Sequence, residues 1–193
     1  MKKWFGKIIV LAILVLVALP GYALAERQHP RPKPAPTPTT TPQPAPTPTT
    51  VTKDEALLIT LINQQRAKHH LAPVKLNTCL MDASRAHSAE MAAKTYFTHN
   101  SRNGESFFRR LQRYGYKRTG YHLWMVGEDI AWGTGLLSSP VAIVDSWMKS
   151  PPHRAVILTP QFREIGVGTA LATKTWKKLS NVTFFTLDMG RRK

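Results

Sequence analysis

Apolar residues recur at helical spacing along two stretches that begin after residue 52. The first stretch predicts a helix over residues 53–71, with one apolar stripe made of Leu57, Leu58, Leu61 and Ile62. Thr52 and Glu55 stand three residues apart at its start and predict a capping box. The second stretch predicts a helix over residues 78–96, whose apolar face holds Leu80, Ala83, His87 and Met91.

Two shorter helices are predicted further along the chain. The first covers residues 106–114, where aromatic and apolar side chains repeat at helical spacing. The second begins at Ser139 and Pro140, because the missing N–H of proline costs nothing in the first helical turn. Pro151 and Pro152 predict that this helix ends and that a turn follows.

Three later stretches have the patterns of strands. Residues 123–132 predict a strand that leads into a loop, and residues 165–172 and 181–189 predict two strands joined by a basic, polar hairpin. Helices early in the chain and strands late are typical of an α+β domain rather than of alternating βα units. We predict one domain over residues 53–193, in which helices cover an antiparallel sheet.

Residues 1–25 predict a secretory signal peptide. Lysines at the start precede an apolar run over residues 8–19, and Ala23 and Ala25 supply small residues for cleavage. The apolar run is shorter than a membrane-spanning helix normally requires. An uncleaved N-terminal membrane anchor is the alternative. Both interpretations export the domain, which we expect to be secreted or associated with the cell wall or surface.

Residues 26–52 predict a disordered linker. Proline occupies nine positions between residues 30 and 48, and threonine and alanine fill most of the others. This composition cannot bury enough apolar surface to fold, and it favours an extended, polyproline-like chain. We interpret the segment as a spacer that holds the domain away from a membrane or carries it through a wall.

The net charge is +16, and residues 53–193 contain 21 Lys and Arg against 10 Asp and Glu. For an exported protein this charge favours an anionic cell-wall polymer or a membrane surface as partner, and no nucleic acid. We interpret the basic residues as a solvated surface, because they form separate groups rather than one run. The groups are Arg109, Arg110 and Arg113; Lys174, Lys177 and Lys178; and Arg191, Arg192 and Lys193.

Cys79 is the one cysteine of the sequence, so the domain has no internal disulfide and depends on its core, which suits a bacterial exported protein. We interpret Cys79 as a small hydrophobe at the start of a helix rather than a reactive thiol. His87 and Glu90 stand three residues apart and could share a ligand. A histidine on an apolar helical face is more often a hydrogen-bonded core residue, and we favour that interpretation.

Short motifs follow one another in order along residues 55–190. They are Leu61-Ile62-Asn63-x-x-Arg66, His87-Ser88-x-x-Met91-Ala92, Tyr96-Phe97-Thr98-His99, Gly127-Glu128-Asp129-Ile130-Ala131, Trp147-Met148-x-Ser150-Pro151-Pro152-His153-Arg154 and Ile165-Gly166-Val167-Gly168. Together they resemble the CAP superfamily, which comprises the cysteine-rich secretory, antigen 5 and pathogenesis-related 1 proteins. The resemblance is closest to its bacterial SCP-like extracellular branch.

This resemblance implies a three-layer α-β-α sandwich with a cleft that contains His99, His153 and Glu128. In relatives that bind a divalent metal, usually zinc, two histidines at the matching positions are the ligands. Many relatives carry a second cleft glutamate three residues after the helix tryptophan, where this sequence has Ser150. The difference argues against an activity that requires two carboxylates.

These residue types also have chemistry of their own. Two neutral imidazoles, His99 and His153, can hold Zn²⁺ or another divalent cation near neutral pH and leave positions open for water. Glu128 could then hydrogen-bond to a metal ligand and orient it, or act as a base toward that water. The alternative is that both histidines hydrogen-bond across the cleft and order its loops. No nucleophile elbow is present, so a serine-based triad is not expected.

We therefore expect a secreted, wall- or surface-associated binding module for an extracellular ligand. The resemblance implies a lipid or sterol, a glycan or a protein as the ligand, without selecting one. The alternative is a metal-dependent hydrolase that acts on a cell-wall or protein substrate, with Glu128 as its catalytic base. The loss of a carboxylate at Ser150 favours binding over hydrolysis.

Overall fold

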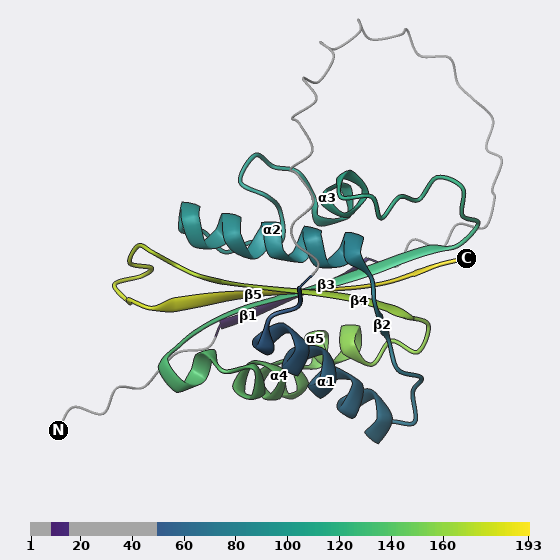
Figure 1. The fold of residues 1–193 in the computed structure, drawn as a ribbon, viewed down its shortest axis with the longest axis horizontal. Coiled ribbons are helices and arrows are strands. Elements are labelled where there is room, and N and C mark those ends of the chain that lie inside the picture. Colours follow the sequence, from purple (N-terminus) through teal and green to yellow (C-terminus); the bar gives the residue numbers. More distant parts are fainter. Residues whose placement is uncertain (1–8, 16–49) are drawn as a thin grey trace, which may run out of the picture.

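The computed structural model describes residues 9–15 and 50–193 and shows three layers (Figure 1). The elements are β1 (Ile9–Val15), α1 (Lys53–Lys68), β2 (Lys75–Leu76), α2 (Thr78–Lys94), α3 (Phe107–Arg113), β3 (Trp124–Thr134), the 3-10 helix η1 (Gly135–Ser138), α4 (Pro140–Lys149), α5 (Pro151–Ile157), β4 (Glu164–Leu171) and β5 (Val182–Arg192). The sheet has the order β1-β3-β5-β4-β2. Helices α2 and α3 cover one face, and α1, α4 and α5 cover the other (Figure 1). The predicted α+β sandwich is confirmed.

Antiparallel pairing dominates the sheet. β5 lies between β3 and β4 and pairs with both along most of its length, which places Glu128 opposite Asp188. β2 adds a two-residue parallel edge beside β4. The sequence analysis did not predict β2, because two residues are too few to show a period. The three predicted strands are present, with β3 extended to Thr134.

β1 pairs antiparallel with the other edge of β3, with Ile13 opposite Glu128. Its residues belong to the apolar run that predicts a signal peptide. The remainder of that peptide and nearly all of the predicted linker lie outside the described residues, so both remain predictions. Within residues 9–15 and 50–193, no helix combines the length and apolar character that crossing a bilayer requires.

Local chemistry sets the ends of the two long helices. The predicted capping box is present: Glu55 N donates to Thr52 Oγ1 at 3.2 Å, and Thr52 N donates to Glu55 Oε2 at 2.9 Å. α1 ends at Lys68, earlier than predicted, because His70 has a φ of 56° and cannot continue a helix. α2 stops before Thr95, which has a φ of 49°.

The prediction of a turn at Pro151 was wrong. α4 ends at Lys149, and Pro151 is the first residue of a new helix, α5. Ser150 between them is extended, with φ −96° and ψ 115°, so it breaks the first helix. Proline then fits the first position of the second helix, where no N–H is needed. This arrangement places His153 in the first turn of α5.

Apolar residues form cores on both faces of the sheet. The largest cluster packs α1, α4 and α5 against the sheet around Trp147. Two smaller clusters pack α2 and α3 onto the other face, around Trp132 and around Tyr116. Every member of these three clusters lies within residues 51–189, so this part of the chain carries its own core.

Gly166 and Gly168 let α2 lie directly on β4. A Cβ at Gly168 would lie 2.4 Å from Arg85 N, and one at Gly166 would lie 2.2 Å from the carbonyl carbon of Leu80. Backbone atoms cannot yield as side chains do, so we expect Gly168→Ala to lower the free energy of unfolding by about 1–3 kcal/mol. Urea denaturation measures the change beside Thr169→Ala. Equal stability of the two variants would contradict this close packing.

Candidate functional site

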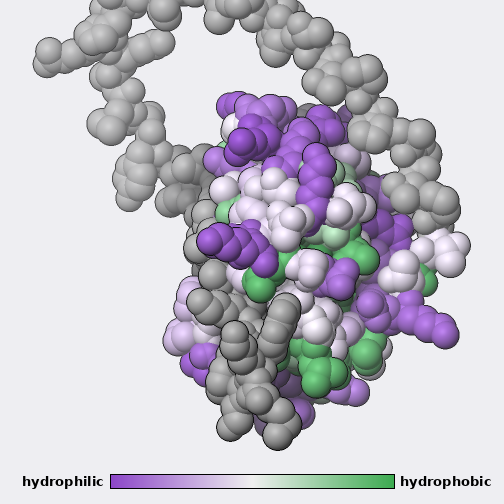
Figure 2. Space-filling model, turned by 90° about the vertical axis from the view of Figure 1, so that its left-hand side faces the viewer, coloured by the Kyte–Doolittle hydropathy of each residue, from purple (hydrophilic) through white to green (hydrophobic). Residues whose placement is uncertain are grey.

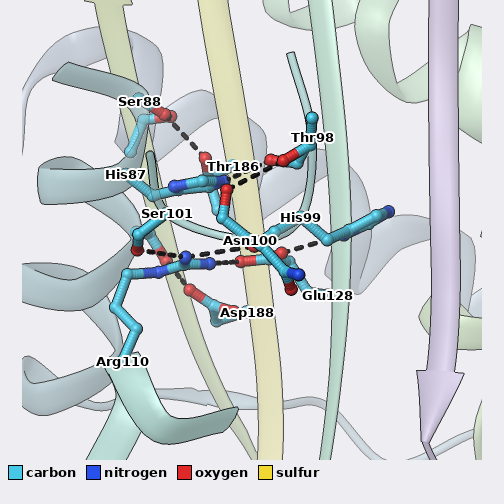
Figure 3. A network of polar contacts seen from close by, with 12 residues as sticks. His87, Ser88, Thr98, His99, Asn100, Ser101, Arg110, Glu128, Thr186 and Asp188 are labelled. Atoms are coloured by element: carbon cyan, nitrogen blue, oxygen red, sulfur yellow. Dashed lines mark hydrogen bonds and ion pairs between the residues drawn. The ribbon is translucent and has the colours of Figure 1, made fainter. Parts of the chain in front are cut away.

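Glu128 lies in the middle of β3, and its side chain is fully buried. It faces the layer of α2 and α3, where its two carboxylate oxygens have different partners (Figure 3). Oε1 accepts a hydrogen bond from His99 Nδ1 at 2.8 Å, and Oε2 forms an ion pair with Arg110 Nη2. We call Glu128, His99 and Arg110 the Glu128 cluster. The structure thus brings two of the three predicted site residues together.

His99 lies in the loop that follows α2 and is 3% exposed. Its Nδ1 donates to Glu128, so the carboxylate fixes the ring and its tautomer. Its Nε2 is buried and has no hydrogen-bond partner within the described part of the chain. Figure 3 shows the ring of His99 extending away from Arg110. A histidine held by a carboxylate through one nitrogen is in the arrangement that metal-binding histidines usually have.

Arg110, on α3, ties this loop to the sheet. In addition to its ion pair with Glu128, its Nη1 donates to the His99 carbonyl and to Ser101 Oγ, both at 3.1 Å. One guanidinium therefore fixes the carboxylate and the backbone of the histidine that the carboxylate orients. This planar group can serve several acceptors at once, which the ammonium of a lysine cannot do in the same geometry.

The assignment of Arg110 to a solvated basic surface was wrong, because its side chain is buried. A signal for this position is present in the sequence. Arg110 follows Phe107 by three residues and precedes Leu111, so it stands on the apolar face of the predicted helix. A cation on such a face requires a buried anion as its partner. The neighbouring Arg109 is exposed, as predicted.

The surroundings of Glu128 keep it ionised. Burial by itself raises the pKa of this carboxyl, but the charge of Arg110 and the hydrogen bond from His99 outweigh burial and lower the pKa to about 2. A carboxylate with this pKa is a weak proton acceptor at neutral pH. Its two oxygens are also already engaged. The geometry therefore suits Glu128 to orient His99 rather than to remove a proton from water.

His153 lies on α5, in the helical layer on the other face of the sheet (Figure 1). Its Nδ1 lies 2.7 Å from the Oγ of Ser150, at the end of the preceding helix α4. Within the described ranges, no three His, Cys, Asp or Glu side chains are grouped so that they could hold a metal ion. His99 and His153 each have Nδ1 engaged, so an ion would have to bind them through Nε2.

His87 is a packed core residue, as we favoured. It is fully buried, and its Nε2 lies 2.9 Å from the carbonyl of Thr98, the residue before His99. Burial lowers the pKa of His87 to about 4, so the ring is neutral near pH 7. Glu90 instead binds Lys94 at 2.7 Å and the Tyr96 hydroxyl at 2.6 Å. His87 thus helps to hold the loop that carries His99.

Two more buried carboxyls neighbour Glu128 in the sheet, Asp188 on the same face and Asp129 on the opposite face. Asp188 stands opposite Glu128 on β5 and accepts a hydrogen bond from Ser84 Oγ at 2.7 Å. Asp129 follows Glu128 on β3, is fully buried, and has no hydrogen-bond partner among the described residues. Burial, and then the charge of Glu128, raises the pKa of both Asp129 and Asp188 well above the usual range.

We expect Asp129→Asn to raise the free energy of unfolding at pH 7 by about 1–3 kcal/mol, because the folded state no longer holds a carboxyl that resists ionisation. The pKa of Asp129 is raised on folding, so its contribution to stability is fully present below pH 3.8, the ordinary pKa of the group. This contribution is lost as the pH rises through the pKa of Asp129 in the folded state. The gain should therefore shrink toward pH 4. Denaturation across pH measures it, with Asp145→Asn, at an exposed position of α4, as control. A gain that is independent of pH would contradict this assignment.

A cavity of about 370 Å³ adjoins the cluster from outside. Arg110 and Ser101 form its inner wall, and the salt bridges of Lys94 with Glu90 and of Arg113 with Glu105 lie along it. A second hollow, of about 460 Å³, lies between α1 and α4. The sequence analysis did not predict either cavity, because each is formed by residues from separate segments.

Two curated bacterial proteins are similar to this chain. The uncharacterized protein YkwD of Bacillus subtilis (strain 168) is 34% identical over 128 residues, which cover 65% of this chain and 46% of that protein. The uncharacterized membrane protein YlbC of the same strain is 30% identical over 118 residues, 61% of this chain and 32% of YlbC. The matched parts therefore span less than half the length of each relative.

Solved structures share the fold. An extracellular protein with an SCP domain from Bacillus anthracis str. Ames is 28% identical, with a TM-score of 0.55, over 72% of this chain and 40% of that chain. An outer surface protein from Borrelia burgdorferi is 20% identical, with a TM-score of 0.59, over 73% of this chain and 94% of that chain, a likeness of fold alone. The family model for the cysteine-rich secretory proteins matches residues 59–189, and this chain belongs to that CAP family.

Proposed function

We propose that this chain is an extracellular bacterial binding module in which the Glu128 cluster forms a prearranged part of the binding site. The observation that carries the proposal is the double engagement of the Glu128 carboxylate by His99 and Arg110. Both partners are buried, so the cluster exists before any ligand arrives. A preorganised site of this kind reduces the cost of ordering side chains on binding.

The same observation weighs against the hydrolase alternative. A general base works best with a pKa near the working pH, whereas the pKa of Glu128 is about 2. Where the resemblance implies a second glutamate, the sequence has Ser150, whose hydroxyl contacts His153. A hydrolytic mechanism would therefore need a proton acceptor that neither residue supplies.

His99 is arranged to offer one nitrogen to a divalent cation. His99 has its Nδ1 bonded to a carboxylate and a buried Nε2 with no partner among the described residues, which is how histidine is held when it binds zinc. We propose His153 as the second ligand on the strength of its sequence motif, and water would fill the remaining positions of the ion. Such an ion, when bound, would offer a ligand a positive centre for its oxygen atoms.

The export of the domain rests on the predicted signal peptide and on the relatives. The Bacillus anthracis structure is described as extracellular, and the Borrelia burgdorferi protein as an outer surface protein. The ligand is then a lipid or sterol, a glycan or a protein met outside the cell. The cavity beside Arg110 is lined by paired charges, which favours a polar ligand there.

Zinc titration by calorimetry tests the proposed ion site on residues 50–193, which contain all three cores. We expect binding of about one equivalent near pH 7, lost in His99→Ala and in His153→Ala, because both imidazoles are needed. His122→Ala, an exposed histidine, serves as control. Binding that survives His99→Ala, or no binding to the native domain, would contradict the ion site and leave both histidines as structural residues.

A parallel assay tests binding against hydrolysis. The zinc-treated domain is incubated with isolated cell walls and with casein, and soluble products are measured over time. We expect no metal-dependent release of product. Release that requires zinc and disappears in Glu128→Gln would overturn the proposal in favour of a hydrolase.

A further inference from the structure

One end of the sheet combines exposed apolar side chains with lysines. β3 and β4 end there, and the hairpin of residues 172–181 leads into β5 (Figure 1). Thr134 Oγ1 donates to the Ser180 carbonyl at 3.2 Å, which fixes the start of η1 beside this hairpin. We call η1 and residues 171–181 the sheet tip. Figure 2 looks onto this end of the molecule and shows hydrophobic residues among hydrophilic ones.

The most exposed large apolar side chains of the described residues lie at or beside the sheet tip. Leu136 in η1 is 92% exposed and Leu171 at the end of β4 is 60% exposed. Val141, in the first turn of α4 directly after η1, is 57% exposed. A leucine side chain that projects into water contributes no burial energy to the fold. A concentration of such side chains at one end therefore indicates a contact surface.

The charge of the sheet tip has one sign. Lys174, Lys177 and Lys178 lie in the hairpin, and residues 134–139 and 171–181 contain no Asp or Glu. Other basic side chains of the domain, such as Arg85, Arg110 and Arg113, form salt bridges within the fold. The three lysines of the tip are exposed and form no salt bridge with the described residues, so they present positive charge to solvent.

The backbone holds these lysines in an unusual turn. Trp176 and Leu179 pair across it, with N–H···O distances of 2.9 and 2.8 Å. The two residues between them, Lys177 and Lys178, have φ values of 49° and 66°, where Asn and Gly are the usual residues. Lys177 Nζ also lies 5.3 Å from the ring centroid of Trp176. Lysine is disfavoured in this backbone conformation, so its presence at both positions points to a role beyond closing the hairpin.

We propose that the sheet tip docks on the surface of a bilayer that contains anionic phospholipids. Lysines attract the headgroups, while Leu136, Leu171 and the half-buried Trp176 enter the interface. A purely polar anionic polymer would use the lysines but would gain nothing from projecting leucines. The combination of both features favours a lipid surface over such a polymer. This surface lies apart from the Glu128 cluster and does not depend on its function.

Vesicle co-sedimentation tests the proposal on residues 50–193. Vesicles of phosphatidylcholine alone are compared with vesicles of equal parts phosphatidylcholine and phosphatidylglycerol. We expect binding to the second only. Lys174→Gln with Lys178→Gln should weaken it by roughly 30-fold, since each lysine near an anionic membrane contributes a factor of about five. Leu136→Ser should weaken binding by about tenfold through the lost apolar insertion.

Matched controls lie at the opposite end of the sheet. Lys75→Gln with Lys117→Gln removes two exposed charges there, and Leu76→Ser removes an apolar side chain that is 42% exposed. We expect both to bind vesicles as the native domain does. Every variant lacks residues 9–15, so the exposed edge of β3 is common to all of them.

Three results would overturn the proposal. Equal binding to both kinds of vesicle, or no binding to either, would show that anionic lipid is not the partner of the sheet tip. Equal losses in tip and control variants indicate attraction by overall charge. Sensitivity to the lysine pair without sensitivity to Leu136→Ser indicates docking by charge alone, and a soluble polyanion would then be the partner. Circular dichroism of each variant verifies that it is folded, which we expect because the substituted side chains are exposed.

Discussion

Arg110→Met is expected to lower the free energy of unfolding at pH 7 by about 3–5 kcal/mol, because it leaves the Glu128 carboxylate buried without its cation. Methionine retains much of the apolar length of arginine. It cannot donate to the His99 carbonyl or to Ser101 Oγ, so the loop after α2 also loses its attachment to α3. Denaturation followed by circular dichroism measures the change.

Two further variants define what this loss means. Arg109→Met removes an exposed charge from the same helix and should change stability by less than about 0.5 kcal/mol. Adding Glu128→Gln to Arg110→Met should recover part of the stability, since no unpaired charge then remains buried. If Arg110→Met costs no more than Arg109→Met, the ion pair does not hold the site together.

Arg66→Met should have a comparable effect, on the opposite face of the sheet. Arg66 is fully buried on α1, and its guanidinium donates at 2.7–3.2 Å to backbone carbonyls of two separate segments. Its removal leaves buried acceptors without donors, and we expect a loss of about 3–5 kcal/mol. The acceptors are the carbonyls of Ala72, Ile157, Thr159 and Phe162.

The controls for Arg66 use the same helix and the same charge. Lys68→Met, at an exposed position of α1, should be nearly neutral. Arg66→Lys should fall between the native chain and Arg66→Met, because one ammonium cannot serve all four carbonyls. An Arg66→Lys domain as stable as the native one would show that the positive charge alone, not the geometry of the guanidinium, stabilises this junction.

The fold could be predicted in most of its elements because its signals are local. The stripe of α1, the capping box at Thr52 and the proline at the start of α4 each act within a few residues. The exception is α5, because Pro151 predicts a helix end and the structure begins a helix there. Proline lacks the backbone N–H that continuing a helix requires, so it cannot extend α4. No such N–H is needed in the first turn of a helix, so the same residue can begin α5.

The candidate site could be predicted only in part. His99, His153 and Glu128 were found through motifs that match a known family, and the structure places the first and third in contact. Arg110 was missed although it stands on the apolar face of its predicted helix, because its partner Glu128 lies on a strand that begins more than ten residues later in the chain. Likewise, the carboxyl of Asp188 lies opposite Glu128 only once β3 and β5 pair.

These contacts explain how the site is stabilised as a unit. Arg110 holds both Glu128 and the backbone of His99, and His87 holds the preceding residue, Thr98. The loop that carries His99 is therefore fixed from two helices and one strand. Such a loop positions its histidine for a ligand without rearrangement, which is the property that the proposed binding module requires.

The charge state of Glu128 tests the central claim most directly. An NMR titration of side-chain carboxyl carbons on residues 50–193, with Glu128→Gln to assign the signal, gives its pKa. The account predicts a value of about 2, so Glu128 remains ionised wherever the domain is folded above roughly pH 3. A Glu128 that titrates near neutrality would contradict the account, because such a group is suited to act as the base of a hydrolase.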